Sequence, residues 1–382
     1  MKFSLLPKII TDSIITINSM NSKYPFFIRS TVVLAGLVLL VVALYYIGDI
    51  LVPLAFAAMF GILLNPLCSW LINKKIPKIL SICICLLVAV IVFGGIGFFV
   101  SSQLANFTTE MPLLKTKSLL LFTKLQHTVD QHIGINIAMQ NKWLAGVQAK
   151  LEPVAANALG GIFGSLSILF LLPVYIYLFL YYKTLLLNFL YEVFAETNTS
   201  EVAVVLTQTK KAIQSFMSGL MLEALIVALL NSAALMLLGV KYALLIGVIG
   251  ALLNILPYIG GIIAIALPLL VATITKDGYN THLWIIISYL IIQFIDNNFL
   301  MPYIVSSKVK INALVSIIMI LMGGALWGVS GMFLSIPFTG LLKIIFDRVP
   351  ELKPWGKLLG TEIPTKSFAR FRRKAVKIKP AA

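Results

Sequence analysis

Apolar runs of about twenty residues recur along the chain, and they constrain its fold more than any other feature of the sequence. The hydrocarbon core of a bilayer is about 30 Å thick, so a helix of about 20 apolar residues crosses it. The chain of 382 residues is 60% hydrophobic and only 12% charged, whereas soluble domains contain about 25% charged residues. The sequence therefore predicts an all-α polytopic membrane protein with room for roughly eight spans.

Basic residues predict which ends of the first four spans face the cytoplasm. Three lysines lie within Asn73–Lys78, between the second and third spans, whereas the turn at Gly48 and Asp49 contains none. Because loops rich in Lys and Arg stay in the cytoplasm, we expect the N-terminus to lie there. These four spans would form a scaffold over 31–182, and their predicted ranges are 31–48, 52–72, 79–100 and 160–182.

Two further segments accompany the scaffold. Residues 1–30 carry four basic side chains among several isoleucines, which predicts a cytoplasmic segment that lies in the membrane interface. Residues 101–158 are polar, and their leucines recur at helical spacing. We expect this second segment outside the cytoplasm, as short amphipathic helices against the membrane face.

The second half of the chain is unusual because two of its apolar segments contain helix breakers. Proline and glycines occur at 257–261, and four glycines occur within 323–331. Such residues remove or weaken helical hydrogen bonds, which is costly in hydrocarbon unless other groups compensate. The expected elements of this half are a cytoplasmic amphipathic helix (183–214) that continues into a span (215–238), a broken segment (242–274), an intact span (281–299), a second broken segment (311–346) and a basic cytoplasmic tail (347–382).

Two architectures fit the broken segments. Each can be one kinked span, which gives eight crossings, or a re-entrant helical hairpin, which gives six; both place the two termini in the cytoplasm. Charge favours the hairpins, because eight crossings would place Lys308 and Lys310 outside. The hairpin arrangement also predicts an inverted repeat within a transport domain at 215–346, as in secondary transporters whose broken helices meet near the midplane.

Polar residues near the breaks are the candidates for a functional site. Amides and hydroxyls both donate and accept hydrogen bonds, which suits a small neutral polyol. Asp296 and Glu223 lie within apolar segments. Two roles are open for each acid: coupling to a cation or a proton, or simple solvation near a helix end. The candidate substrate-binding residues are Asn254, Pro257, Tyr258, Gly260, Gly261, Gln293, Asn297, Gly323 and Gly324; Asn254 and Asn297 have the alternative role of capping half-helices.

Three stretches in this half resemble the signature regions of a known family. They are residues 252–270, 291–315 and 323–346, beginning with Leu252, Ile291 and Gly323. Together with the spacing of the spans, they resemble the AI-2E family of bacterial inner-membrane transporters. The resemblance implies a transporter that exports autoinducer-2 or, alternatively, a sodium(lithium)/proton antiporter. Asp296 stands where the family more often has Glu, and Glu223 has no match in the family pattern.

Other classes of function find little support in the sequence. The three histidines lack the spacing of a zinc protease, and no phosphate-binding loop is present, so the sequence predicts no catalytic residue, metal site or cofactor. A channel would need more aligned polar faces, and a structural protein would not need the breaks. We expect membrane lipids as partners, with anionic lipid at the basic tail, a homo-oligomer, no nucleic acid, and protons or sodium besides the solute.

Overall fold

Helices form all of the regular secondary structure in the part of the chain that the structure describes. This confirms the all-α fold class. The chain divides into two compact units, Met1–Leu51 and Val52–Ala382. The structure, a computed structural model, describes residues 25–109, scattered positions between 116 and 146, and residues 166–194, 199–255, 260–276, 280–305 and 311–361.

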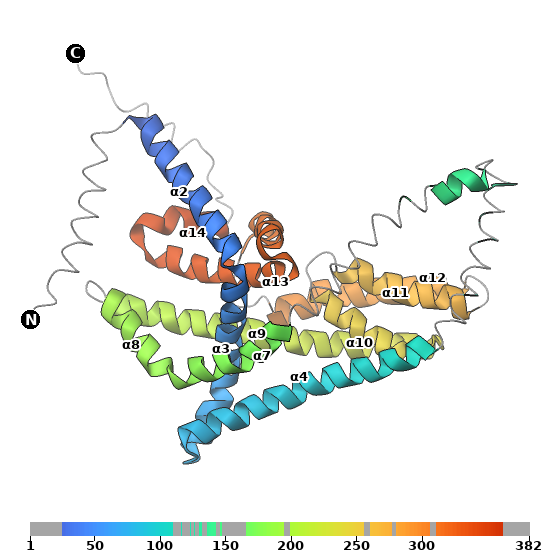
Figure 1. The fold of residues 1–382 in the computed structure, drawn as a ribbon, viewed down its shortest axis with the longest axis horizontal. Helices are drawn as coiled ribbons and strands as arrows, with labels where there is room; N and C mark the ends of the chain where they lie inside the picture. The colour runs from blue at the N-terminus through green and yellow to red at the C-terminus, as the bar shows by residue number, and fades with distance from the viewer. Residues whose placement is uncertain are drawn as a thin grey trace, which may run out of the picture. The chain divides into compact units, whose positions relative to one another are not determined.

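The first unit contains helix α2, Phe26–Tyr46 (Figure 1). Its side chains are mostly exposed, as expected for a helix with an apolar surface on all sides. The helix ends at Ile47, whose amide donates to the carbonyl of Ala43 at 3.0 Å, and α3 begins at Gly48.

The N-terminal part of the second unit contains most of α3 (Gly48–Asn73), followed by α4 (Lys78–Thr109), α7 (Leu166–Tyr181) and α8 (Lys183–Phe194). Buried side chains of α3, α4 and α7 pack in one apolar cluster that includes Cys68, Cys85 and Ile176. Helix α8 turns away from α7 by 64° and buries none of its residues. Its exposed leucines and phenylalanines give it the apolar face of an interfacial helix.

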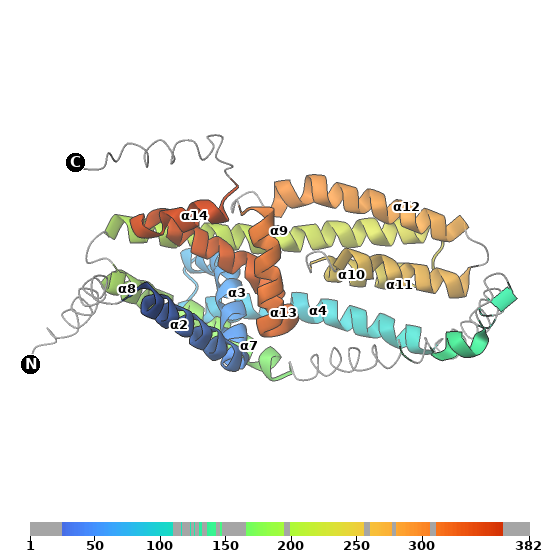
Figure 2. The same ribbon diagram turned by 90° about the horizontal axis from the view of Figure 1, so that it is seen from above.

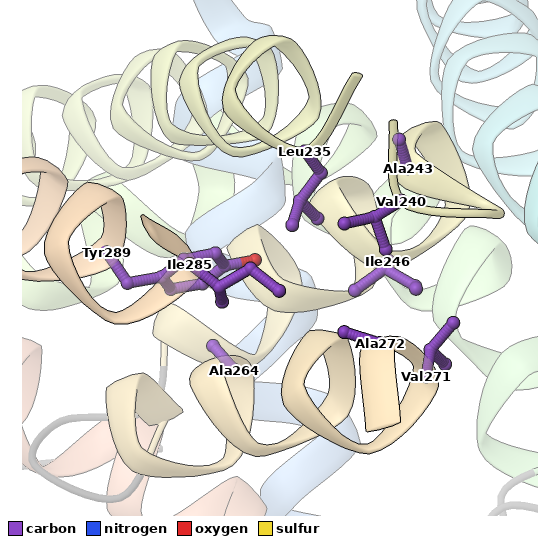
Figure 3. Close-up of a cluster of buried hydrophobic side chains, with 9 residues drawn as sticks. All are labelled: Leu235, Val240, Ala243, Ile246, Ala264, Val271, Ala272, Ile285 and Tyr289. Atoms are coloured by element: carbon purple, nitrogen blue, oxygen red, sulfur yellow. The ribbon is translucent and has the colours of Figure 1, made fainter. Parts of the chain in front are cut away.

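Four helices form the bundle that contains the candidate site. They are α9 (Thr199–Leu237), α10 (Ala243–Asn254), α11 (Gly260–Thr275) and α12 (Asn280–Ile295), and they lie side by side (Figure 2). Figure 3 shows the apolar cluster between them, to which Leu235, Ile246, Ala264 and Ile285 contribute. Helix α12 continues into the π-helix η1, Asp296–Val305, which the sequence did not predict.

Helices α10 and α11 form a helical hairpin. At its tip, an added Cβ on Gly260 would lie 1.9 Å from the Leu253 carbonyl oxygen, so the chain reverses within a few residues there. Farther along, a Cβ on Gly250 would lie 3.5 Å from the Ala264 Cβ. At about 1.5 Å per residue, each arm spans about 18–24 Å, which is shorter than the hydrocarbon core.

Helix α13 (Ala313–Arg348) also folds back on itself, at Trp327 and Gly328. Gly328 has φ of 59°, a conformation that favours glycine. The Ser335 hydroxyl donates to the Met319 carbonyl at 2.8 Å, although these residues would lie about 24 Å apart along a straight helix. The two halves of α13 are therefore antiparallel neighbours.

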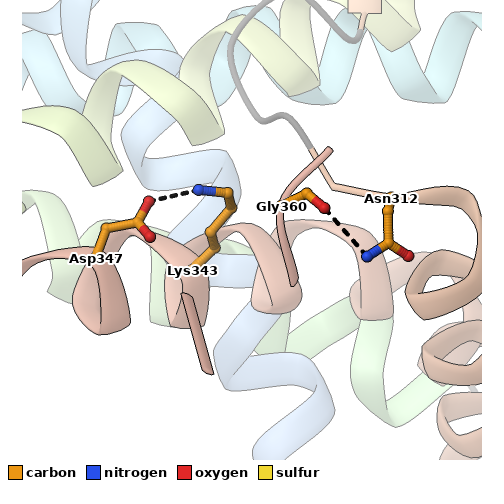
Figure 4. A network of polar contacts seen from close by, with 4 residues as sticks. All are labelled: Asn312, Lys343, Asp347 and Gly360. Carbon is orange, nitrogen blue, oxygen red and sulfur yellow. Dashed lines mark hydrogen bonds and ion pairs between the residues drawn. The ribbon is translucent and has the colours of Figure 1, made fainter. Parts of the chain in front are cut away.

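The open end of this second hairpin is fixed by Asn312 and the C-terminal helices. The Asn312 side chain accepts from the Val315 amide, as an N-cap, and donates to the carbonyls of Leu358 and Gly360. Figure 4 shows the bond to Gly360. Figure 4 also shows the ion pair between Lys343 and Asp347. The C-terminal elements are the 3₁₀ turn η2 (Pro350–Leu352) and α14 (Lys353–Leu359).

Five helices among the described residues are long and apolar enough to cross a membrane, or six if the bent pair α7 and α8 is one span. One of the five is α13, although it reverses direction. Most of the predicted segments 1–30 and 101–158, and the tail beyond residue 361, lie outside the described residues, and so do Lys308 and Lys310.

Candidate functional site

Glu223 is the acidic residue on the buried face of α9. This face has a helical spacing of three and four residues, and its other members are Met217, Leu220, Val227, Asn231 and Leu235. The Glu223 side chain is only 4% exposed, and its Oε2 atom has no hydrogen-bond partner. An unpaired charge in such surroundings would cost several kcal/mol, so the carboxyl needs a proton or a cation.

Asp296 is the second buried acid, and it begins the π-helix. Its side chain is 2% exposed; Oδ2 accepts from Nδ2 of Asn254 at 2.8 Å, and Oδ1 has no partner. A π-helix has a wider turn than an α-helix, and π segments often occur at functional sites. Asp296 lies inside the bundle, while the next two residues, Asn297 and Asn298, are exposed.

The two carboxyl groups meet, because the Glu223 side chain lies within hydrogen-bonding reach of Asp296. A carboxylate only accepts hydrogen bonds, so a bond between two carboxyl groups requires a proton on one of them. Two negative charges at this range repel each other strongly where water is excluded. A proton shared between the two carboxyl groups, or a cation bound in its place, would remove this repulsion.

The end of α10 and the start of α11 lie beside the carboxyl pair. Asn254, which ends α10, binds Asp296, and Gly261, which begins α11, packs against α12. A Cβ on Gly261 would lie 2.8 Å from Oε1 of Gln293. Gln293 in turn donates to Oδ1 of Asn297 at 3.4 Å. Side chains from α9, α10, α12 and η1, together with the backbone of α11 at Gly261, thus surround a small polar site in an apolar bundle.

Comparison with known proteins identifies the family. The chain matches the AI-2E family transporter profile over residues 34–351. It belongs to the AI-2E transporter family.

Relatives of this AI-2E family transporter are similar over most of their length. The putative transport protein YrrI of Bacillus subtilis is 27% identical over 311 residues, which cover 78% of this chain and 86% of YrrI. The AI-2 transport protein TqsA of Escherichia coli is 24% identical over 329 residues, 84% of this chain and 92% of TqsA. The putative permease PerM of Escherichia coli is 27% identical over 222 residues, 57% of this chain and 62% of PerM. The chain is therefore a multi-pass membrane transporter.

The structure brings together several of the residues that the sequence singled out in this AI-2E transporter. Asn254, Gly261, Gln293 and Asp296 lie around one site with Glu223. Asn297 adjoins it through Gln293 but is exposed. Gly260 lies at the hairpin tip, where it allows the two arms to approach.

The other candidates lie elsewhere or outside the described residues. Gly323 and Gly324 belong to α13 and pack against its second half, where Cβ atoms would meet Gly331, Ser335 and Met332. Their observed contacts are those of close helix packing, and their role in substrate binding stays a prediction. Pro257 and Tyr258 lie outside the described residues.

Sequence reasoning missed the contact between Glu223 and Asp296, and it missed three buried polar residues nearby: Asn231, Ser232 and Tyr289. The sequence feature that could have revealed Asn231 and Ser232 is the presence of this Asn-Ser pair inside an apolar run. Among the described residues of this transporter, no group of three or more His, Cys, Asp or Glu side chains could hold a metal ion.

Proposed function

We propose that this chain is a bacterial inner-membrane secondary transporter that exports a small, polar, uncharged solute, with autoinducer-2 as the first candidate. The observation that carries the proposal is the buried pair of Glu223 and Asp296 at the tip of a helical hairpin. Ionisable residues within membrane spans are costly and typically mark ion or substrate pathways. No enzymatic role is proposed.

The carboxyl pair is proposed to couple transport to proton movement. With one proton between them, the two acids carry a single negative charge; loss of that proton leaves two charges that repel each other. Asn254 is attached to the pair through its hydrogen bond to Asp296, so a change in protonation acts directly on the hairpin tip. Protonation of Glu223 or Asp296 would then favour one position of the hairpin over another.

The solute is proposed to bind beside the pair, where the amides of Asn254 and Gln293 face the start of α11. Amide groups donate and accept hydrogen bonds, and together with the unpartnered carboxyl oxygens they match the hydroxyls of a polyol. The similarity to the AI-2 transport protein TqsA supports autoinducer-2 as the first solute to test.

A second candidate function is sodium(lithium)/proton antiport, and the same carboxyl pair favours it. Two carboxyl groups and an amide oxygen supply the oxygen ligands that a hard monovalent cation prefers. In this version a cation replaces the shared proton of Glu223 and Asp296, and no organic solute is needed.

The membrane arrangement is also a proposal. Both hairpins are proposed to be re-entrant, in a six-crossing topology with both termini in the cytoplasm and the basic tail on anionic lipid. The short arms of α10 and α11 and the reversal of α13 at Gly328 support re-entry. A homo-oligomer in which the first four spans form a fixed scaffold is proposed as the assembly.

Counterflow in proteoliposomes tests the proposed solute. Wild-type protein is expected to exchange labelled autoinducer-2, and Asn254→Ala or Gln293→Ala is expected to weaken its affinity roughly tenfold to a hundredfold, since each removes a buried hydrogen-bond partner. Asn298→Ala is the matched control, because its exposed amide only binds the Phe294 carbonyl in its own helix. Sodium and proton movement without any autoinducer-2 exchange would reject the solute and favour the antiporter.

A further inference from the structure

Three buried polar side chains lie farther along α10 from its Asn254 end than the carboxyl pair, and each has an atom without a partner. The atoms are Asn231 Oδ1, Ser232 Oγ and Tyr289 OH. The exposed fractions of these side chains are 2%, 4% and 7%. In an apolar, membrane-embedded bundle, leaving so many polar atoms unsatisfied is costly.

These side chains come from two helices and face the same part of α10. A Cβ on Gly250 would lie 3.3 Å from Asn231 Nδ2 and 3.7 Å from Tyr289 OH, so the two groups are neighbours. Ser232 packs against Gly247, one turn earlier on α10. Figure 3 shows the Tyr289 hydroxyl pointing toward the middle of the apolar cluster.

The Ser232 hydroxyl, like that of Thr209 in the same helix, lacks a bond that several other helical hydroxyls in this protein make. Thr273, Thr275 and Thr339 each donate to the carbonyl four residues earlier in their own helices. This bond is the usual way for a buried Ser or Thr to be satisfied within a helix. The Ser232 hydroxyl makes no such bond and is free to bind a guest.

The three atoms define the chemistry of that guest. Asn231 Oδ1 can only accept a hydrogen bond, whereas the hydroxyls of Ser232 and Tyr289 can donate or accept. A water molecule can donate to Asn231 Oδ1 and accept from the two hydroxyls, which gives it the two to four partners that buried water requires. The three side chains are neutral and the surrounding cluster is apolar, which disfavours an ion.

The three side chains also lie on the helix that carries Glu223 or on the helix directly before Asp296. Tyr289 of α12 lies seven residues, about 10 Å, before Asp296, which begins η1, and Asn231 lies about 12 Å beyond Glu223 along α9. His282 lies a further seven residues back, near the N-terminal end of α12, with Nε2 at 2.9 Å from Thr273 Oγ1. His282, Tyr289 and Asp296 therefore form one line of proton-carrying groups.

We propose that Asn231, Ser232 and Tyr289 form an internal hydration site, whose water molecules supply protons from the His282 end of the bundle to the carboxyl pair. The hydration site stands on the unpartnered atoms alone. The supply of protons rests on the proposed function, so the two parts are tested separately.

Radiolytic footprinting of the full-length protein in lipid nanodiscs, without any solute, tests the hydration site. Radicals formed from bound water modify the side chains next to it, so Tyr289 is expected to be modified rapidly despite its burial. Met217 is the control: it is 3% exposed, belongs to an apolar cluster and is intrinsically more reactive than tyrosine. If Tyr289 is as unreactive as Met217, the site is dry and the proposal is overturned.

The sign of a stability change gives a second test. If water satisfies the Tyr289 hydroxyl, Tyr289→Phe leaves the other partners incomplete and lowers the melting temperature by roughly 1–4 °C. If the hydroxyl has no partner at all, the same change removes the free-energy cost of burying an unsatisfied polar group and raises the melting temperature. Tyr182→Phe, at an exposed position, is the control for loss of a hydroxyl.

Proton uptake by proteoliposomes tests the supply of protons. Tyr289→Phe is expected to slow proton uptake while equilibrium exchange of autoinducer-2 continues at the wild-type rate. If Tyr289 is modified in footprinting of the wild type but Tyr289→Phe takes up protons at the wild-type rate, the water site is retained. Its role in proton supply is then overturned. Absence of autoinducer-2 exchange in the wild type would instead contradict the proposed function and leave the hydration test intact.

Discussion

Substitution of Gly323 by alanine tests whether α13 folds back on itself. A Cβ at this position would lie 2.1 Å from the Ser335 hydroxyl and 2.4 Å from the Gly331 carbonyl oxygen, and ordinary contacts begin at 3.4 Å. The hydroxyl can rotate away, but the carbonyl belongs to the backbone of the opposite half. The two halves must therefore separate by about 1 Å to admit the methyl group.

The magnitude follows from two contributions. Overpacking of a close helix contact costs about 1–3 kcal/mol. Separation of the halves also stretches the 2.8 Å bond from Ser335 to the Met319 carbonyl, which is worth about 1 kcal/mol. The expected loss is about 2–4 kcal/mol, which lowers the melting temperature by roughly 2–5 °C in a protein of this size.

Thermal unfolding in lipid nanodiscs, followed by tryptophan fluorescence, measures the effect. Gly94→Ala is the matched control, because nothing lies within 4 Å of an added Cβ in that helix. The control should be neutral or slightly stabilising, by up to about 1 kcal/mol, since alanine is the better helix former. If Gly323→Ala were as well tolerated as Gly94→Ala, the two halves of α13 would not be in contact, and the hairpin would be wrong.

Three other substitutions probe the site and the hairpins. Asp296→Asn should leave the fold intact but abolish ion coupling, because it removes the charge and keeps the shape; unchanged pH dependence of transport would exclude Asp296 from coupling. Asn312→Ala should lower the free energy of unfolding by about 1–2 kcal/mol through loss of the N-cap, measured by thermal melting. A cysteine at Ser306 in a cysteine-free background should react with impermeant reagents only from the cytoplasmic side, and labelling from the periplasm would favour eight crossings.

The sequence was sufficient to predict helices and breaks, because these depend on local properties. Long apolar runs identified the membrane helices, and proline and glycine located the interruption between Asn254 and Gly260. The reversal at Trp327 and Gly328 likewise lies inside the glycine-rich stretch of the second broken segment. The π-helix after Ile295 was not predictable, since its altered hydrogen bonding has no simple sequence signature.

The candidate site was predictable only in part, because a site depends on which helix faces overlap in space. Glu223 and Asp296 were each recognised as unusual acids in apolar segments, but their contact joins residues far apart in the sequence. Tyr289 was not singled out in the sequence, and only its position beside Asn231 and Gly250 distinguishes it. Gly323 illustrates the opposite case, in which a glycine chosen for its place near a break is packed tightly against another helix.

Proton movement driven by a solute gradient tests the role of the carboxyl pair most directly. Proteoliposomes loaded with autoinducer-2 and a pH indicator are diluted into solute-free buffer, and the internal pH is followed for wild type, Glu223→Gln and Asp296→Asn. The wild type is expected to move protons as the solute leaves. Both variants are expected to lose this proton movement while they still exchange labelled autoinducer-2 at equilibrium. Proton movement at the wild-type rate in Glu223→Gln would contradict the assignment of coupling to the buried carboxyl pair.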